Sequence, residues 1–542
     1  MSAEHPAARE PALGEVVVGR AEVTIEDVVS VARGAVSVRL CDDAAFVARH
    51  DAARRALLER LARDGVVYGV TTGFGDSCET DVRGELVSEL PSNLYRFHGC
   101  GVGESFTREE SGAILMARLA SLAQGYSAVR LEVLRGLVRL LRSGALPVIP
   151  SQGSVGASGD LTPLSYVAAV LAGEREVYYG GEVREAAGVL AEIGLAPLRL
   201  EAKESLALMN GTSAMTGVAC LSVARAERLA RWAAALTAVA SDVLGGEPRH
   251  FDARIFDAKP HPGQALVARW IREDIEYDRE RARPVMRVQD RYSVRCAPHV
   301  LGVLVDALPE IRRFVETELN GANDNPLIDP DTGDVLHGGN FYGGHVCHAM
   351  DSLKTLVANV ADLLDRQLVL LCHPNTNNGL PANLVGLRGP RAAAHHGFKA
   401  MQITTSALAA EAAKLTMPAS VFSRSTENHN QDKVSMGTIA ARDAARVLTL
   451  AETVAAIHTL ALAQAVDLRE GEGCHRRSRS LHAQVRAFVP QNLADRRMDG
   501  DIALVLDLHR SGRLDSGFAE CGLVGAGRAT GGSCLGEARA GA

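Results

Sequence analysis

A run of small residues between Gly153 and Leu164, GSVGASGDLTPL, carries the most distinctive chemistry of this sequence. At its centre, Ala157, Ser158 and Gly159 could cyclise if the Gly159 amide nitrogen attacks the Ala157 carbonyl. Small residues are needed because the nitrogen must approach that carbon inside normal van der Waals distance. Loss of two waters, one taking the Ser158 hydroxyl, would leave an exocyclic methylidene. The chain would then carry an electrophile that no ordinary side chain supplies.

Two plainer interpretations of this run stay open from the residues alone. A Gly- and Ser-rich tripeptide is common, and it can simply form a turn. Ser158 could also be a hydrolase nucleophile, but the run Gly156–Asp160 lacks the final glycine of the Gly-x-Ser-x-Gly elbow.

A second run, Val67–Gly75 (VYGVTTGFG), predicts a loop with one phenol, Tyr68, at its base. A phenol with a pKa near ~10 needs neighbouring cationic or amide donors before it can act as a base at neutral pH. The alternative is a buried tyrosine that anchors a turn.

Polar side chains recur in three further motifs. Asn210 stands beside a glycine in LMNGTS, where it could also cap a helix. In QDRYSVR, Tyr292 and Arg295 lie three apart, on one face of a helix if the stretch is helical, and an arginine can bind a carboxylate through two hydrogen bonds. Asn325 precedes a proline, which favours extended backbone, although its motif would also pass for a turn.

The last motif, Ser425–Asp432 (STENHNQD), contains Glu427 and Gln431, and Lys399 lies upstream. An acid here could accept the proton of a substrate ammonium group. The alternative is a solvated ion pair between Glu427 and Lys399.

A metal site is disfavoured. The candidate ligands His345, Cys347 and His348 lack the paired spacing of a structural zinc site, so a polar helical face is expected there.

The run Gly153–Leu164 resembles, at every position, the signature of the histidine, phenylalanine and tyrosine ammonia-lyase and aminomutase family, whose prosthetic group is 4-methylidene-imidazol-5-one (MIO). The other motifs follow in the family's order between residues 67 and 432, so the resemblance covers most of the chain. It is closest to the pattern of bacterial tyrosine ammonia-lyases. It implies a carbon–nitrogen lyase, a mainly α, fumarase/aspartase-like fold, and a homotetramer whose active sites each use three chains.

The resemblance also implies a role for each motif. The catalytic residues would be Ala157, Ser158 and Gly159, which form the MIO, Tyr68, which takes the β-proton, Asn210 against the ring, and Tyr292 as a second catalytic tyrosine. The substrate-binding residues would be Arg295 and Asn325 at the carboxylate, Phe341 in the pocket, Glu427 near the amine, Gln431 near the ring, Lys399 beside Glu427, and Gln289, which opens the Tyr292 motif.

Phe97 and His98 occupy the position that contacts the far end of the substrate in related enzymes, and this pair departs from the family's usual combinations. His98 can bind a phenol, and such a site should reject phenylalanine because the histidine would be left unpaired. Histidine is disfavoured because the run 430–432 lacks the extra Glu that histidine lyases insert after Gln. We therefore expect L-tyrosine, giving trans-4-coumarate and ammonia.

Other activities stay open. Tyrosine 2,3-aminomutase shares the same steps, and Phe97, Lys399 and Glu427 resemble the phenylalanine ammonia-lyase type. Outside the family, a non-catalytic helical scaffold would also explain the long helices.

The elements that must position these residues are mostly helices. Capping and periodicity predict helices from Thr107 to about Gln124 and from Leu131 to Gly144, and a hairpin over Tyr178–Val183. Long helices are expected over Ser213–Leu244, Ala297–Leu319, Val346–Leu371 and Gly437–Leu468.

At 542 residues, the chain should contain at least two lobes. We expect a loose arm over residues 1–22 and an N-terminal lobe, with mixed helix and strand, over 23–212. A long-helix bundle over 213–480, a helical segment over 481–515 and a flexible tail over 516–542 should follow.

The composition is ordinary for a soluble globular protein. The net charge of −7 suggests neither nucleic acid nor membrane as partner. Ten cysteines without paired spacing indicate reduced thiols and a cytoplasmic location, and the N-terminus lacks an apolar signal-peptide core. Ser205–Ala224 carries no charge, but its polar residues favour a buried helix over a membrane span.

Overall fold

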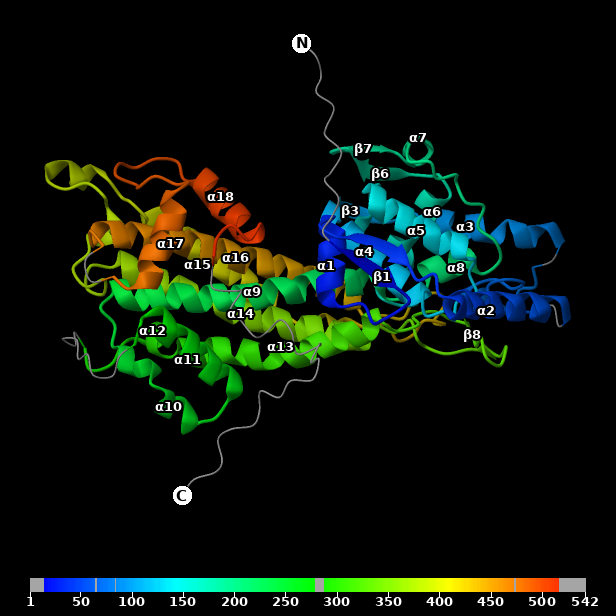
Figure 1. Ribbon diagram of the computed structural model, residues 1–542, viewed down its shortest axis with the longest axis horizontal. Coiled ribbons are helices and arrows are strands. Elements are labelled where there is room, and N and C mark those ends of the chain that lie inside the picture. The colour runs from blue at the N-terminus through cyan, green and yellow to red at the C-terminus, as the bar shows by residue number, and fades with distance from the viewer. Residues whose placement is uncertain (1–13, 64–65, 83, 278–286, 472–473, 516–542) are drawn as a thin grey trace, which may run out of the picture. The chain divides into compact units, whose positions relative to one another are not determined.

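A computed structural model describes residues 14–63, 66–82, 84–277, 287–471 and 474–515. Helices dominate, as predicted, and the strands are short (Figure 1). The chain forms two compact units. The first comprises the described residues up to 226 together with 307–361 and 407–451, and the second comprises 227–306, 362–406 and the described residues from 452 onward. The finer domain boundaries expected from the sequence remain predictions, and the tail 516–542 lies outside the described residues.

The first unit holds most of the shorter elements. Its helices are α1 (Ile25–Arg33), α2 (Ala44–Arg63), α3 (Leu90–Phe97), α4 (Arg108–Leu122), α5 (Leu131–Ser143), α6 (Leu161–Leu171), α7 (Ala186–Glu192) and α8 (Glu204–Met209), with the 3-10 turns η1 (Gly75–Glu79), η2 (Gly84–Ser88) and η6 (Ala419–Phe422). Helices α1, α4 and α5 pack in sequence, and α8 packs against α6.

The strands of the described residues form four small sheets, and each of these lies in the first unit. They are β1 (Glu15–Val18), β2 (Ser37–Leu40), β3 (Val102–Ser105), β4 (Leu146–Pro147), β5 (Pro150–Gln152), β6 (Glu176–Tyr179), β7 (Glu182–Glu185), β8 (Leu327–Ile328) and β9 (Val335–Leu336). Strand β1 pairs with β2 in parallel, and the other sheets, β3-β5, β4-β6-β7 and β8-β9, are antiparallel. The predicted hairpin is the β6-β7 pair, in which Tyr178 lies opposite Val183.

Five long helices contribute residues to both units. They are α9 (Ser213–Val243), α13 (Ala297–Leu319), α14 (Gly344–Cys372), α15 (Lys399–Lys414) and α16 (Gly437–Leu468). The second unit adds α10 (Ala253–Asp257), α11 (Pro262–Asp274), α12 (Tyr292–Arg295), α17 (Arg476–Arg486), α18 (Asp499–Arg510) and the 3-10 turns η3 (Pro248–Phe251), η4 (Ala382–Leu384) and η5 (Pro390–Ala394). The four long helices predicted from composition and helix propensity therefore form within one or two residues of their expected ends.

Local signals in the sequence explain where α4 and α5 begin and end. The Thr107 hydroxyl accepts the Glu110 N–H, and the Glu110 carboxylate accepts the Thr107 N–H, which forms the predicted capping box. Gly144 ends α5 at φ +72°, a conformation that glycine adopts without strain.

Two local expectations were wrong. Residues 15–18 form β1, so they are not part of a loose arm. The polar, Pro-containing composition of the N-terminus gave no indication of this short Val-rich strand. Residues 1–13 lie outside the described part. The uncharged stretch 205–224 is not one helix, because Gly211 at φ +145° interrupts it between α8 and α9.

Among the helices of the described ranges, one, α16, is long and apolar enough to cross a membrane by length and composition. However, 89% of its most apolar window is buried inside the protein. A helix whose apolar residues are already covered by the chain is a core helix.

Candidate active site

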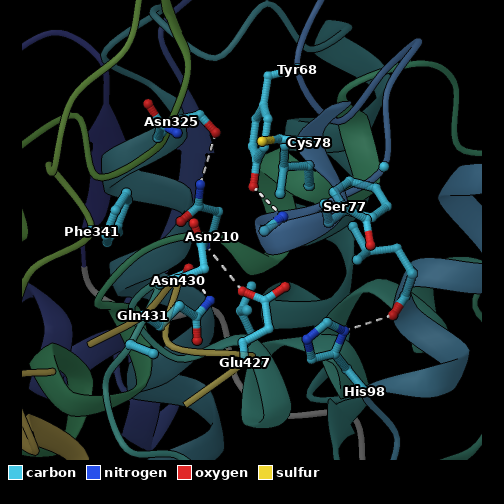
Figure 2. A pocket seen from close by; sticks show the side chains of 18 of the residues that line it. Tyr68, Ser77, Cys78, His98, Asn210, Asn325, Phe341, Glu427, Asn430 and Gln431 are labelled. Atoms are coloured by element: carbon cyan, nitrogen blue, oxygen red, sulfur yellow. Dashed lines mark hydrogen bonds between the residues drawn. The ribbon is translucent and has the colours of Figure 1, made fainter. Parts of the chain in front are cut away.

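Most of the predicted site residues of the first unit meet in one cavity of about 720 Å³ (Figure 2). The predicted residues that line it are Tyr68, Phe97, His98, Ala157, Ser158, Asn210, Asn325, Phe341, Glu427 and Gln431. They come from segments more than 300 residues apart in sequence, and the fold of the first unit brings them together.

The predicted ring-forming tripeptide precedes α6. Gly159, at φ +71°, lies so close to Gly211 that an added Cβ would stand 2.1 Å from the Gly211 carbonyl oxygen. Gln431 donates from Nε2 to the Ser158 hydroxyl across 3.0 Å. Only glycine fits this approach, so the residues present are compatible with the compact ring that the sequence suggests.

Asp160 fastens this segment to the helices beneath it. Its N–H donates to the Gly211 carbonyl over 2.7 Å, and its carboxylate accepts the Met215 N–H and the Thr438 and Ser154 hydroxyls. Burial raises the pKa of Asp160, and these donors oppose that rise. The tripeptide is thus held at the cavity wall by its own following residue.

Tyr68 is anchored between two buried valines. Val67 and Val70 belong to an apolar cluster with α2 and β8, so the base of the loop is fixed in the core. The Tyr68 oxygen accepts the Gly75 N–H over 2.8 Å, and the His337 ring lies edge-on with its centroid 6.4 Å away.

To act as a base at neutral pH, Tyr68 needs neighbouring donors that lower its pKa. Within the described part of the chain, the Gly75 N–H is such a donor, but burial, and then the Glu427 charge, raise the pKa of Tyr68 above 10 overall. The surroundings that this chain supplies therefore favour the phenol over the phenolate.

Two asparagines are linked across the cavity. Asn210 ends α8, and its Nδ2 donates to the Asn325 carbonyl over 2.9 Å (Figure 2). Its buried Oδ1 has no hydrogen-bond partner among the described residues. The Asn325 Oδ1 accepts the Gly338 N–H over 2.9 Å, which directs its NH₂ group to act as a donor.

Glu427 lies in an unusual turn. Glu427, Asn428 and His429 are consecutive non-glycine residues with φ of +51°, +51° and +68°. Such a turn stores backbone strain, which structures retain mainly at functional sites. The Glu427 carboxylate accepts the Asp76 N–H over 3.0 Å and the Asn430 amide over 3.2 Å.

The role of the 75–79 segment was missed from the sequence. A Cβ on Gly75 would stand 1.7 Å from the Glu427 carboxylate, so these two loops meet closely. Cys78 and His337 also line the cavity. The glycines at 73 and 75 were the available signal, but they reveal a close approach without naming the partner.

His98 follows α3, beside the half-exposed Phe97, with ring centroids 4.1 Å apart. The His98 Nδ1 lies 3.0 Å from the Leu94 carbonyl, which can only accept, so Nδ1 carries the proton. Burial lowers the pKa of His98, which favours the neutral ring. Its Nε2 is then a hydrogen-bond acceptor.

Four predicted residues belong to the second unit and do not line this cavity: Gln289, Tyr292, Arg295 and Lys399. Tyr292 and Arg295 share one turn of helix α12, as expected, with the guanidinium carbon 4.8 Å from the ring centroid. The expected Lys399–Glu427 pair stays a prediction.

The candidate metal ligands of α14 have other neighbours. The rings of His345 and His348 lie 5.2 and 6.0 Å from that of Phe314. Within the described ranges, no group of three His, Cys, Asp or Glu side chains is arranged to hold a metal ion.

Comparison with known proteins places this site in a family. Residues 23–487 match the aromatic amino acid lyase family. The histidine ammonia-lyase of Gloeobacter violaceus is 41% identical over 92% of this chain and 97% of its own. The tyrosine aminomutase of Streptomyces globisporus superposes with a TM-score of 0.85 at 36% identity, over 93% of this chain and 98% of its own. The histidine ammonia-lyase of Trypanosoma cruzi gives 0.84 at 32% identity, over 93% and 95%.

These matches cover nearly the whole length of this chain and of each compared chain. The fold has the fumarase/aspartase-like architecture. The chain belongs to the aromatic amino acid lyase family and is a carbon–nitrogen ammonia-lyase.

Proposed function

We propose that this enzyme eliminates ammonia from L-tyrosine to give trans-4-coumarate, with an MIO formed from Ala157, Ser158 and Gly159. The ring would supply the electrophile to which the substrate amine is attached during the elimination. The observation that carries the choice of substrate is the acceptor nitrogen of His98 in the cavity.

A phenol O–H can donate to the His98 Nε2, whereas phenylalanine has no donor for this nitrogen. A site built around such a bond discriminates strongly, by up to about 10⁴-fold, against the analogue that lacks the donor.

L-Histidine is the second candidate. Its imidazole N–H could donate to the same nitrogen, and several relatives are named histidine ammonia-lyase. The residues that follow Gln431 in this cavity are Asp432 and Lys433, without the additional Glu of histidine lyases, and this favours tyrosine.

The chain's own residues would divide the work as follows. Tyr68 removes the β-proton, Glu427 accepts the proton of the substrate ammonium group, and the NH₂ group of Asn325 holds the carboxylate. The electron pair of the broken C–H bond forms the double bond, and the C–N bonding pair leaves on the amine nitrogen. The protons taken up by Tyr68 and Glu427 return to the departing nitrogen or to water, so atoms and charge balance. The Gly75 N–H would stabilise the Tyr68 oxygen while it is anionic.

We propose that Arg295 and Tyr292 enter this site from another subunit of a cytoplasmic homotetramer. No arginine lines the cavity among the described residues, although an amino-acid carboxylate calls for one. Mixing two inactive variants, Ser158→Ala and Arg295→Met, tests this. Hybrids that regain activity support shared sites, and inactive hybrids contradict them.

The substrate is tested by ultraviolet assay of the wild-type enzyme with L-tyrosine, L-phenylalanine and L-histidine in parallel. We expect coumarate from tyrosine, loss of all turnover in Ser158→Ala, and a preference shifted toward phenylalanine by about 100-fold or more in His98→Phe. Turnover of histidine alone, or of none of the three, would overturn the proposal. Chromatography for β-tyrosine in the same samples separates the lyase from an aminomutase.

A further inference from the structure

A buried arginine lies directly behind the two asparagines of the cavity. Arg118, in the middle of α4, is among the largest fully buried side chains of the protein. Its Nη1 donates to the Asn210 carbonyl over 2.9 Å, and its Nη2 donates to the Asn323 carbonyl over 3.1 Å. One guanidinium thus joins the two segments that carry Asn210 and Asn325.

This charge is not part of a conventional ion pair. In the described ranges, Arg118 has no carboxylate oxygen within salt-bridge distance, although Asp324 and Asp160 lie near enough to favour its charged form. Burial lowers the pKa of Arg118 to about 10, which leaves it charged at neutral pH. A buried charge is a poor way to gain stability alone, because an apolar side chain of similar size usually serves as well or better. This points to a role in placing the carbonyls.

The packing around Arg118 allows little freedom. A Cβ on Gly211 would stand 2.4 Å from the Arg118 Nη1 and 2.4 Å from the Asn323 oxygen. Ser121, one turn along α4, holds both groups in place. Its hydroxyl accepts from the Arg118 Nη2 over 2.8 Å and from the Asn323 N–H over 3.0 Å.

A buried ion pair holds the residues that follow Asn323 in the same irregular segment. Lys203 and Asp324 are 2.5 Å apart and fully buried, and the Asp324 carboxylate accepts the Asn325 N–H over 2.7 Å. Gly211 in turn exchanges backbone hydrogen bonds with the tripeptide segment through Ser158 and Asp160. Arg118 therefore lies where three segments of the cavity wall meet: those that carry Asn210, Asn325 and the tripeptide 157–159.

We propose that Arg118 is a positioning residue, which sets the spacing between Asn210 and Asn325 by binding the backbone carbonyls of Asn210 and Asn323. This inference rests on the proposed function for its activity readout. Without the guanidinium, the Asn210 and Asn323 carbonyls would lose their buried donors, and the 2.9 Å bond from Asn210 to Asn325 would no longer be enforced.

The test uses Arg118→Lys, Arg118→Met and Ser121→Ala. An ammonium on a shorter reach cannot serve both carbonyls, so we expect kcat/KM to fall about 100-fold in Arg118→Met, 10- to 100-fold in Arg118→Lys and about 5-fold in Ser121→Ala. Ser111→Ala is the matched control, because Ser111 is a buried serine of the same helix whose hydroxyl has no partner among the described residues. It should stay within twofold of wild type.

All rates are measured per folded enzyme, well below each melting temperature. Wild-type kcat and KM in folded Arg118→Lys and Ser121→Ala would overturn the proposal. If Arg118→Met fails to fold, the two milder variants still decide. An inactive wild type would instead reject the proposed function. A crystal structure of Arg118→Lys decides independently of activity: we expect the Asn210–Asn325 bond to lengthen beyond 3.5 Å, and an unchanged bond would refute the positioning role.

Discussion

At Gly75, the addition of one methyl group should lower the activity of the enzyme much more than its stability. Replacing it with alanine places a Cβ 1.7 Å from the Glu427 carboxylate, at a backbone φ of +58°. Two hydrogen bonds depend on this approach: the Gly75 N–H to the Tyr68 oxygen, and the Asp76 N–H to Glu427. We expect Glu427 to move away and the loop to shift from Tyr68.

The loss of stability should be modest. An alanine with positive φ costs about 1 to 2 kcal/mol. The displaced Glu427 side chain is exposed and regains hydration, so its release adds less than about 1 kcal/mol. Activity should fall further, because each lost hydrogen bond is worth about 1 kcal/mol, or about 5-fold in rate. Both losses together predict a kcat/KM about 30-fold lower.

Gly84→Ala is the matched control. Gly84 has a similar φ of +64°, but an added Cβ meets no atom within 4 Å. Both variants should therefore lose similar stability in thermal unfolding, whereas Gly84→Ala should keep its kcat/KM within about threefold of wild type. Equal activity in the two variants would refute the argument that contact with Glu427, rather than backbone strain, makes Gly75 essential.

Three further predictions concern pH and helix capping. Because the Glu427 charge raises the pKa of Tyr68, Glu427→Gln should move the acidic limb of the kcat/KM profile to lower pH, and an unmoved limb would contradict this. Burial raises the pKa of Glu318 from 4.5 to about 7, although the hydrogen bond that the Thr212 hydroxyl donates to its carboxylate opposes the rise. The folded state then holds a proton that the unfolded state has lost, so stability should fall as pH rises from about 4.5 to 7, by on the order of 3 kcal/mol. Glu318→Gln should remove that slope in melting temperatures taken between pH 5 and 8, and an unchanged slope would assign it elsewhere. Thr107→Ala should cost about 1 kcal/mol in urea unfolding by removing the α4 cap, and a loss below about 0.3 kcal/mol would show that the capping box contributes little.

Much of the helical framework could be predicted because its signals are local. The helix-favouring composition of α9, α13, α14 and α16 is a property of each segment alone, and the caps at Thr107 and Gly144 depend on residues within a few positions of one another. The expectations for residues 15–18 and 205–224 were wrong because they were based on the overall composition of each segment and not on its individual residues. The valines of β1 form a strand only by pairing with distant β2, and the helix is interrupted at Gly211, where Gly159 and Arg118 lie too close to leave room for a Cβ.

The sequence by itself determined the reaction class and identified the tripeptide that we propose forms the ring, because Gly153–Leu164 and the other motifs are contiguous patterns of residue types. Only the tertiary structure decided which of those residues share a cavity, that His98 presents an acceptor, and that Gly75 lies against Glu427. The physical reason is distance along the chain. A hydrogen bond between residues 76 and 427, or a guanidinium shared by residues 210 and 323, follows from how the backbone packs, and no local pattern encodes it.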